Sequence, residues 1–210
     1  MKGIEQEFKW DGGTPKAFER FLIALKKECD SLSVCKQIEI TDYYLDDEEE
    51  TLSRQKIALR IRRSGRNWES TCKSRSHLKK GLAVRQEKTF SLARMQTIKN
   101  VLRELTSSCI WKKISKKGDL KVRFKIRNHR RVYLASYKNC LCEAALDNYV
   151  TFAGGHQMRR KEIELELKKG STKDFKELIK KISVSSELMP SKISKVAGAE
   201  KWILRKFRLA

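Results

Sequence analysis

The chain has 210 residues, 40% of them hydrophobic, and is therefore long and apolar enough to fold around a sizeable core. Lys and Arg number 48 against 26 Asp and Glu, and the formal net charge of +22 predicts polyanionic partners such as nucleic acid, anionic lipid or small phosphate compounds. No apolar run approaches the length of a membrane span, and the N-terminus does not resemble a signal peptide, so we expect a cytoplasmic protein without a membrane partner.

The 6 cysteines and 3 histidines are scattered along the chain, without a C-x-x-C pair. This spacing argues against a zinc site. We expect the cysteines to be reduced and mostly buried as small hydrophobic residues.

Hydrophobic periodicity divides the chain into strands and helices. The first strand is predicted at residues 4–10. Thr14 and Pro15 then predict the N-cap and first position of a helix whose apolar face runs from Phe18 to Leu25. Further helices are predicted at residues 91–108, after a cap at Thr172, and in the basic segment 191–210. The remaining strands are predicted at residues 38–45, 58–63, 67–74, 82–89, 120–127, 132–137, 140–150 and 162–168.

Strands dominate this pattern and follow one another in hairpin order. We therefore expect an α+β fold that is mainly antiparallel β, with about eight strands in a sheet or closed barrel and helices packed outside. Because the sequence contains no repeat and no low-complexity linker, residues 1–210 are predicted to form one domain.

Charged side chains on the predicted strands are sorted by sign. Residues two apart on a strand share a face, so Glu5, Glu7 and Lys9 project together, as do the alternating charges of residues 162–168. The strands between them carry cations: Arg60, Arg62, Lys73, Arg85 and the arginines of residues 123–131. If the sheet closes, its first and last strands become neighbours and their carboxylates converge near a ring of cations.

This pattern supports two interpretations. An E-x-E-x-K strand alone is more often the solvated face of an antiparallel sheet than a catalytic site. However, paired carboxylates supply the oxygen ligands that divalent cations prefer, and Arg and Lys bind phosphates. The sorting by sign therefore also indicates a metal-assisted phosphoryl-transfer site.

Seven motifs follow one another along most of the chain: Glu5-x-Glu7-x-Lys9, Tyr43–Asp46 with Leu59–Arg62, Trp68–Lys73, Gly81–Glu87, Ala145–Asp147, Glu162–Lys168, and Ser191-Lys192. In this order they resemble the CYTH superfamily, also called triphosphate tunnel metalloenzymes. The resemblance is strongest to its bacterial inorganic triphosphatase branch. It implies a closed tunnel of eight antiparallel strands with a charged interior, and hydrolysis of a triphosphate with Mg²⁺ or Mn²⁺.

The resemblance also implies roles for individual residues. The metal ligands would be Glu5, Glu7, Glu162 and Glu164, with Asp147 assisting. The residues that bind phosphate would be Lys9, Arg60, Arg62, Lys73, Arg85, Arg130 and Lys192. Glu87 would either join the metal ligands or orient Arg85. Arg130 is preferred to Arg123, Arg127 and Arg131 because it precedes the aromatic Tyr133 by three residues.

Inorganic triphosphate (tripolyphosphate) is the favoured substrate, with orthophosphate as the product. Thiamine triphosphate, nucleoside triphosphates and RNA 5′-triphosphate ends stay open, because the motifs contact phosphates and not the leaving group. Class IV adenylyl cyclase activity is a further alternative, although the chain starts without that branch's histidine-led extension.

A protein that only binds nucleic acid belongs to a different functional class. Such a protein is expected to carry its cations on an outer surface, interleaved with aromatic residues, and to bind in a salt-dependent manner. The sorted acidic strands argue against this class, because carboxylates repel phosphate unless a metal ion intervenes, although the net charge keeps nucleic acid open as a partner. The basic tail is interpreted as a solvated amphipathic helix, and residues 46–50 as a solvated hairpin turn, apart from the motif residue Asp46.

Overall fold

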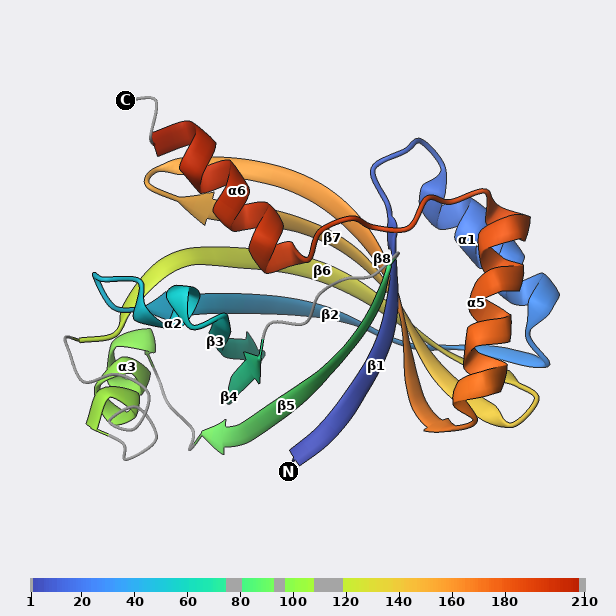
Figure 1. The fold of residues 1–210 in the computed structure, drawn as a ribbon, viewed down its shortest axis with the longest axis horizontal. Helices are drawn as coiled ribbons and strands as arrows, with labels where there is room; N and C mark the ends of the chain where they lie inside the picture. Colours follow the sequence, from blue (N-terminus) through green and yellow to red (C-terminus); the bar gives the residue numbers. More distant parts are fainter. Residues whose placement is uncertain (1, 75–80, 93–96, 108–118, 208–210) are drawn as a thin grey trace.

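The computed structural model describes residues 2–74, 81–92, 97–107 and 119–207, and its strands form one curled sheet flanked by helices (Figure 1). In chain order the elements are β1 (Lys2–Asp11), α1 (Ala17–Glu28), β2 (Ser31–Asp46), α2 (Thr51–Arg54), β3 (Ile57–Ser64), β4 (Asn67–Ser74), β5 (Leu82–Leu92), α3 (Ile98–Ser107), β6 (Lys121–Tyr137), β7 (Cys140–Ala153), β8 (His156–Gly170), α5 (Thr172–Ser186) and α6 (Lys195–Phe207).

The strands are hydrogen-bonded in the order β1-β5-β4-β3-β2-β6-β7-β8, and every neighbouring pair is antiparallel. This confirms the expected antiparallel, β-rich α+β fold. The first and last strands of this order, β1 and β8, also pair with each other, over residues Glu7–Asp11 of β1. Residues 156–161 of β8 pair with β7 alone. The strands diverge from this short seam, so the sheet is an open, curled half-barrel (Figure 1). The expectation of a closed eight-stranded barrel is therefore corrected.

Strand β6 is continuous, although the sequence predicted two strands separated at residues 128–131. The prediction was wrong because this run is polar on both faces and lacks apolar alternation. The structure explains the polarity, since Asn128 and Arg130 point into a polar cavity while His129 between them faces outward.

The start of α1 also differs from its prediction. Thr14 and Pro15 precede the helix, which begins at Ala17 after Lys16 with a left-handed φ of 58°. The Ala17 N–H donates to the Thr14 carbonyl oxygen at 3.2 Å, so Thr14 and Pro15 form a turn instead of a cap.

Helix α5 begins as predicted, but its cap is Ser171 rather than Thr172. The Ser171 Oγ accepts the N–H of Asp174 at 3.2 Å, which satisfies one of the free amides of the first turn.

The segment predicted as a solvated turn at residues 46–50 contains two buried carboxylates. Asp46 accepts the N–H groups of Leu52 and Ser53 at 2.8 and 2.9 Å, and Asp47 accepts that of Thr51 at 2.9 Å. These are the unpaired amides at the start of α2, where a negative charge is stabilising. Asp46 and Asp47 therefore bind the free amides at the start of α2 from outside the helix, whose N-cap position is Glu50.

Helices α1 and α5 pack together on the outside of the sheet, as expected (Figure 1). Trp10, Phe21, Phe175 and Leu165 are fully buried in the core beneath them. Helix α3 lies over a second outer cluster at the other end of the sheet.

Helix α6 is amphipathic, as expected: its basic residues Lys201, Arg205 and Lys206 are exposed, whereas its opposite face packs against the sheet. Its Ala199 is buried against Ile126 and Tyr149, whose positions on β6 and β7 alternate with outward-facing residues. Because α6 rests on these inward-facing residues, its first turn reaches the interior of the curled sheet. No helix among the described residues is long and apolar enough to span a membrane.

Candidate active site

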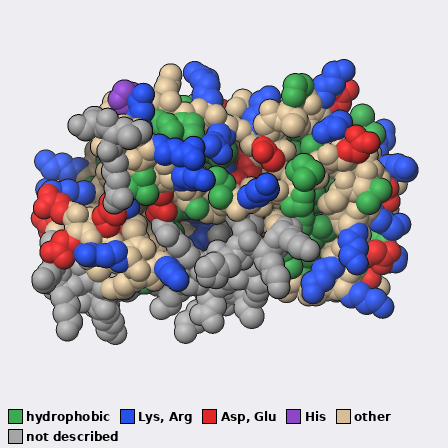
Figure 2. Space-filling view, turned by 45° about the horizontal axis from the view of Figure 1, so that its top comes forward, with side chains coloured by type: hydrophobic (Ala, Val, Ile, Leu, Met, Phe, Trp, Pro, Cys, Tyr) green, Lys and Arg blue, Asp and Glu red, His purple; other side chains and the backbone are tan. Residues whose placement is uncertain are grey.

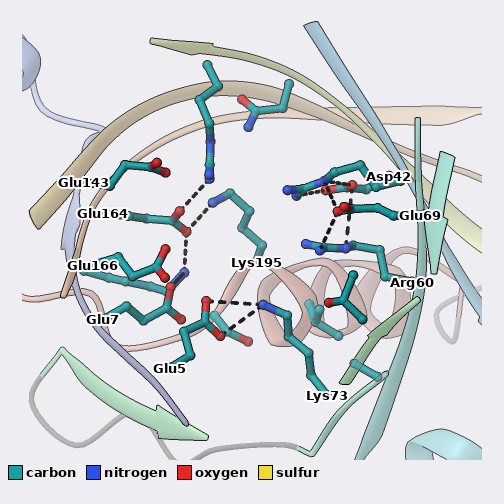
Figure 3. Close-up of a pocket in the computed structure, with 18 of the residues that line it drawn as sticks. Glu5, Glu7, Asp42, Arg60, Glu69, Lys73, Glu143, Glu164, Glu166 and Lys195 are labelled. Carbon is teal, nitrogen blue, oxygen red and sulfur yellow. Dashed lines mark hydrogen bonds and ion pairs between the residues drawn. The ribbon is translucent and has the colours of Figure 1, made fainter. Parts of the chain in front are cut away.

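Inward-facing side chains of the curled sheet surround a cavity of about 480 Å³ (Figure 3). Strands β1, β7 and β8 supply an acidic wall of five residues: Glu5, Glu7, Glu143, Glu164 and Glu166. Opposite this wall, β3 and β4 supply Arg60, Arg62 and Lys73. Lys195, the first residue of α6, projects between the two walls (Figure 3).

The pairing of β1 with β8 determines which charges meet. Glu7 lies opposite Glu166, and Lys9 lies opposite Glu164. Directly opposed residues on antiparallel strands share a face, so the ammonium of Lys9 enters the row of β8 carboxylates. Glu5 lies further along β1 and receives Lys73, whose Nζ is 3.1 Å from a carboxylate oxygen.

Three buried carboxylates form the centre of the site. Oxygen atoms of Asp147, Glu162 and Glu164 lie within 4.8 Å of one another. The Nζ of Lys195 lies 2.6 Å from an oxygen of each of the three and so bridges them. Lys9 donates to Glu162 at 3.2 Å and also contacts Glu164. We refer to Asp147, Glu162 and Glu164 as the acidic trio.

Arg130 binds the acidic trio from β6. Its Nε and one terminal nitrogen each lie 2.6 Å from an oxygen of Asp147, and the same terminal nitrogen lies 2.5 Å from Glu164. The other three arginines of residues 123–131 point elsewhere: Arg123 contacts Asp46 beside α2, Arg127 lies over the ring of Phe152, and Arg131 lies over the ring of Phe18.

These contacts shift the pKa values of the trio in different directions. Burial alone raises the pKa of a carboxyl group, but Lys195, Lys9 and Arg130 outweigh burial at Glu164 and hold its pKa well below the usual range. For Asp147, Lys195 and Arg130 likewise overcome burial and lower the pKa. For Glu162, burial prevails over its lysine partners and the pKa is raised.

The cationic wall contains a carboxylate that the sequence analysis missed. Asp42 of β2 is 3% exposed and accepts a two-pronged contact from Arg62, at 2.7 Å from Nε and 2.9 Å from the terminal nitrogen. Arg60 donates to Thr71 at 3.2 Å and lies 3.6 Å from Glu69. Burial would raise the pKa of Asp42, but Arg60 and Arg62 lower it. Asp42 shares a face with Tyr44, and this alternation was its only signal in the sequence.

Lys192, the lysine predicted after the last strand to bind phosphate, does not reach the cavity, but a neighbouring lysine does. Lys192 is exposed and does not line the cavity, whereas Lys195 does. A second Ser-Lys pair, Ser194-Lys195, follows the first by three residues. Lys195 enters the site because it lies on the inward-facing first turn of α6.

Two further predicted residues, Arg85 and Glu87, lie on β5. Their backbones pair with Glu5 and Gly3 of β1, which sets their register beside the acidic wall. Their side chains lie outside the described part of the chain.

The described side chains of the site are close to electrical balance. The cations are Lys9, Lys36, Arg60, Arg62, Lys73, Arg130, Lys168 and Lys195. The carboxylates are Glu5, Glu7, Asp42, Glu69, Glu143, Glu164 and Glu166, together with Asp147 and Glu162 of the trio. The formal charge of +22 is therefore not concentrated here, and Figure 2 shows Lys and Arg spread over the visible outer face.

The sequence matches a protein-family profile and a curated relative. The CYTH domain profile matches residues 5–199. An inorganic triphosphatase from Haemophilus influenzae is 26% identical over 152 residues, or 72% of this chain. The chain spans 42% of the length of that curated relative.

Solved structures of similar fold include a putative adenylyl cyclase from Hippeastrum described as having a dominant triphosphatase activity. It aligns with a TM-score of 0.70 at 22% identity, covering 94% of this chain and 96% of that one. A protein from Pyrococcus horikoshii aligns with a TM-score of 0.58 at 16% identity, covering 93% and 99%. A putative adenylate cyclase from Bacillus halodurans aligns with a TM-score of 0.54 at 21% identity, covering 98% of each chain. Likeness at these identities shows the fold alone. Since the domain profile covers nearly the whole sequence, the chain belongs to the CYTH family.

Proposed function

We propose that the chain hydrolyses a linear triphosphate, with inorganic tripolyphosphate as the favoured substrate and orthophosphate as the product. The observation that carries this proposal is the cavity with an acidic wall on β1, β7 and β8 and a cationic wall on β3 and β4. A phosphate chain between these walls meets Arg and Lys on one side and potential metal ligands on the other. The inorganic triphosphatase from Haemophilus influenzae supports the same reaction class.

The donor atoms of the acidic trio fit a divalent metal ion. Asp147, Glu162 and Glu164 offer hard oxygen ligands within 4.8 Å of one another, and their shared contact with the ammonium of Lys195 supports a site for positive charge. Glu5 and Glu7 line the same cavity and are proposed to complete the ligand set. When bound, Mg²⁺ or Mn²⁺ would neutralise phosphate charge and lower the pKa of a bound water.

The near balance of charges supports metal dependence. Nine carboxylates among the described residues of the site offset its eight cations, so a highly charged triphosphate gains little net attraction from the protein alone. Lys9, Lys195 and Arg130, which pair with the trio, would contact phosphate when the charge of the trio is neutralised by a bound metal ion.

The chain's own residues then position the substrate. Arg60, Arg62 and Lys73 are proposed to bind phosphate oxygens from β3 and β4, with Arg62 oriented by its contact with Asp42. Arg130, Lys9 and Lys195 are proposed to stabilise the negative charge that develops near the trio. Beyond the paired β1–β8 seam, the curled sheet is proposed to close around the bound chain as a tunnel, within a single domain over residues 1–210.

A panel of substrates tests the proposal. Phosphate release would be measured with tripolyphosphate, thiamine triphosphate, ATP and a short RNA with a 5′-triphosphate, with Mg²⁺, with Mn²⁺ and with EDTA. We expect release from tripolyphosphate to be fastest and to stop in EDTA. Cyclic AMP would be measured in the ATP reactions, because two of the similar structures are putative cyclases. Cyclic AMP without phosphate release, or no turnover of any substrate, would contradict the proposal.

A further inference from the structure

The outward-facing side of β6 and β8 carries a second group of cations, separate from the cavity. Six basic residues form this surface, which we call the outer basic face: Lys125, Arg127, His129 and Arg131 of β6, with Arg159 and Lys161 of β8. None of the six lines the cavity of the candidate active site.

Strand register arranges these residues in two rows. On β6 the basic residues alternate with inward-facing ones such as Asn128 and Arg130. Strand β7 lies between the rows, because Arg127 pairs with Val150 and Val150 pairs with Arg159. Alternate residues on a strand are about 7 Å apart and neighbouring strands about 4.8 Å, so the rows lie about 10 Å apart on either side of β7.

These cations differ from those of the cavity in their partners. Among the residues that the structure describes, Lys125, Arg127, Arg131, Arg159 and Lys161 form no ion pair. His129 alone has a carboxylate nearby, with Nε2 3.8 Å from Glu39. In contrast, every cationic side chain on the wall of β3 and β4 is within 4.0 Å of a carboxylate.

Aromatic rings lie among the cations. Lys125 and Arg127 are 4.9 and 5.5 Å from the ring centre of Phe152, which lies on β7 between the rows. At the border with α1, Arg131 and Lys161 are 5.8 and 5.5 Å from the ring centre of Phe18. The two basic rows are therefore separated by a strip that includes the apolar side chains of Val150 and Phe152.

We propose that the outer basic face binds single-stranded nucleic acid. Its cations are spaced regularly along one direction, as the phosphates of an extended strand are, and they are available for phosphate contacts. The apolar strip beside them suits unstacked bases, which a duplex keeps in its interior. A metal-free polyphosphate would use the cations but gain nothing from Phe152. The cavity of the proposed triphosphatase has no share in this binding.

Fluorescence anisotropy with a labelled 12-nucleotide single-stranded RNA tests this inference between 50 and 200 mM NaCl. The double variant Arg127→Glu/Lys161→Glu should bind at least about tenfold more weakly. The slope of log affinity against log NaCl concentration should become shallower by about 1.4, because each of two lost phosphate contacts contributes about 0.7. The control is Lys201→Glu/Arg205→Glu on the exposed side of α6, which makes the same change in net charge. The control should bind within about twofold of the wild type. Melting temperatures would verify that both variants are folded.

The variant Phe152→Ala tests whether the outer basic face is built for nucleic acid or for any polyanion, such as inorganic polyphosphate. It should weaken RNA binding several-fold while leaving the ability of long-chain inorganic polyphosphate to displace the RNA unchanged. The inference is wrong if the wild type does not bind the RNA, or if the α6 control loses as much affinity as the β6–β8 variant. Equal affinity for a 12-base-pair duplex, together with no effect of Phe152→Ala, would also overturn it. These outcomes do not depend on triphosphate hydrolysis, which neither double variant should change.

Discussion

The two faces of β6 show how the same kind of residue acquires different properties in one strand. Arg130 points inward and contacts two buried carboxylates at 2.5–2.6 Å. Its neighbour Arg131 points outward, where its guanidinium lies 5.8 Å from the ring centre of Phe18. Alternation along the strand thus separates cations that are paired with carboxylates from cations that have no carboxylate partner among the described residues.

The energetic consequences differ accordingly. Removing one member of a buried charge pair costs about 3–5 kcal/mol, because its partner is left uncompensated. A cation over an aromatic ring at an exposed position contributes about 0.5–1 kcal/mol. The inner face is therefore sensitive to single substitutions, whereas the outer face acts through the number and spacing of its charges.

The largest effect is expected on the acidic trio. Glu164→Gln keeps the size of the side chain but removes a charge that meets Lys9, Arg130 and Lys195. We expect turnover of tripolyphosphate to fall by about 10²–10³, the usual effect of losing one electrostatic contribution in an active site. The control is Glu39→Gln on the outward-facing side of β2, whose side chain is 75% exposed. Equal losses in steady-state kinetics of both variants would show that the inner and outer faces are not functionally distinct.

Lys195 contacts the acidic trio, whereas Lys192, three residues earlier, is exposed, so the pair allows the same comparison within one short segment. Lys195→Met leaves the acidic trio with one cation fewer, so unfolding should be easier by about 3–5 kcal/mol. Mn²⁺ should raise the melting temperature of this variant more than that of the wild type, because the metal ion can replace the lost ammonium. Lys192→Met should melt as the wild type does. Thermal melts with and without Mn²⁺ measure this, and a Mn²⁺ shift no larger in Lys195→Met than in the wild type would contradict cation binding by the trio.

The smallest effect concerns Asp42, and it depends on pH. The pKa of Asp42 is lowered in the folded state, so its stabilising contribution is present above the unfolded pKa of about 3.9 and is lost as the pH falls through the folded value. Asp42→Asn removes the nearer of the two carboxylates beside Arg62, at 2.7 Å against 4.0 Å for Glu69, and should cost about 3 kcal/mol at pH 7. Urea unfolding at pH 7, 5 and 3 should show a constant difference between variant and wild type down to about pH 4 that narrows below it. The same difference at pH 3 as at pH 7 would rule out this ion pair as the cause.

Much of the fold was predictable because strand alternation and helix periodicity are local patterns. The sorting of charges by sign along the strands groups Glu5 with Glu7 and Arg60 with Arg62 on shared faces, whereas Arg130 was preferred within its cluster only because of its spacing from Tyr133. Long-range features were less accessible. The register that sets Lys9 opposite Glu164 depends on how β1 meets β8, which the sequence of either strand alone does not specify.

Lys195 and Asp42 were missed for the same reason, because their contacts depend on long-range packing. Lys195 was passed over for Lys192 because both follow a serine, and only the packing of α6 against inward-facing residues separates them. Asp42 was missed because a single carboxylate beside two tyrosines resembles ordinary strand alternation. Its function as the partner of Arg62 appears only once β2 is paired with β3.

Arg130→Gln compared with Arg131→Gln tests the central claim most directly, because the two arginines are adjacent in one strand and differ only in the face they occupy. The measurement is kcat/KM for tripolyphosphate with Mg²⁺, on variants shown to be folded by their melting temperatures. We predict a loss of about 10²–10³ for Arg130→Gln, as expected for a group that stabilises transition-state charge, and a value within about twofold of the wild type for Arg131→Gln. An equal loss in both variants, or a larger loss for Arg131→Gln, would contradict the assignment of the inner face as the active site.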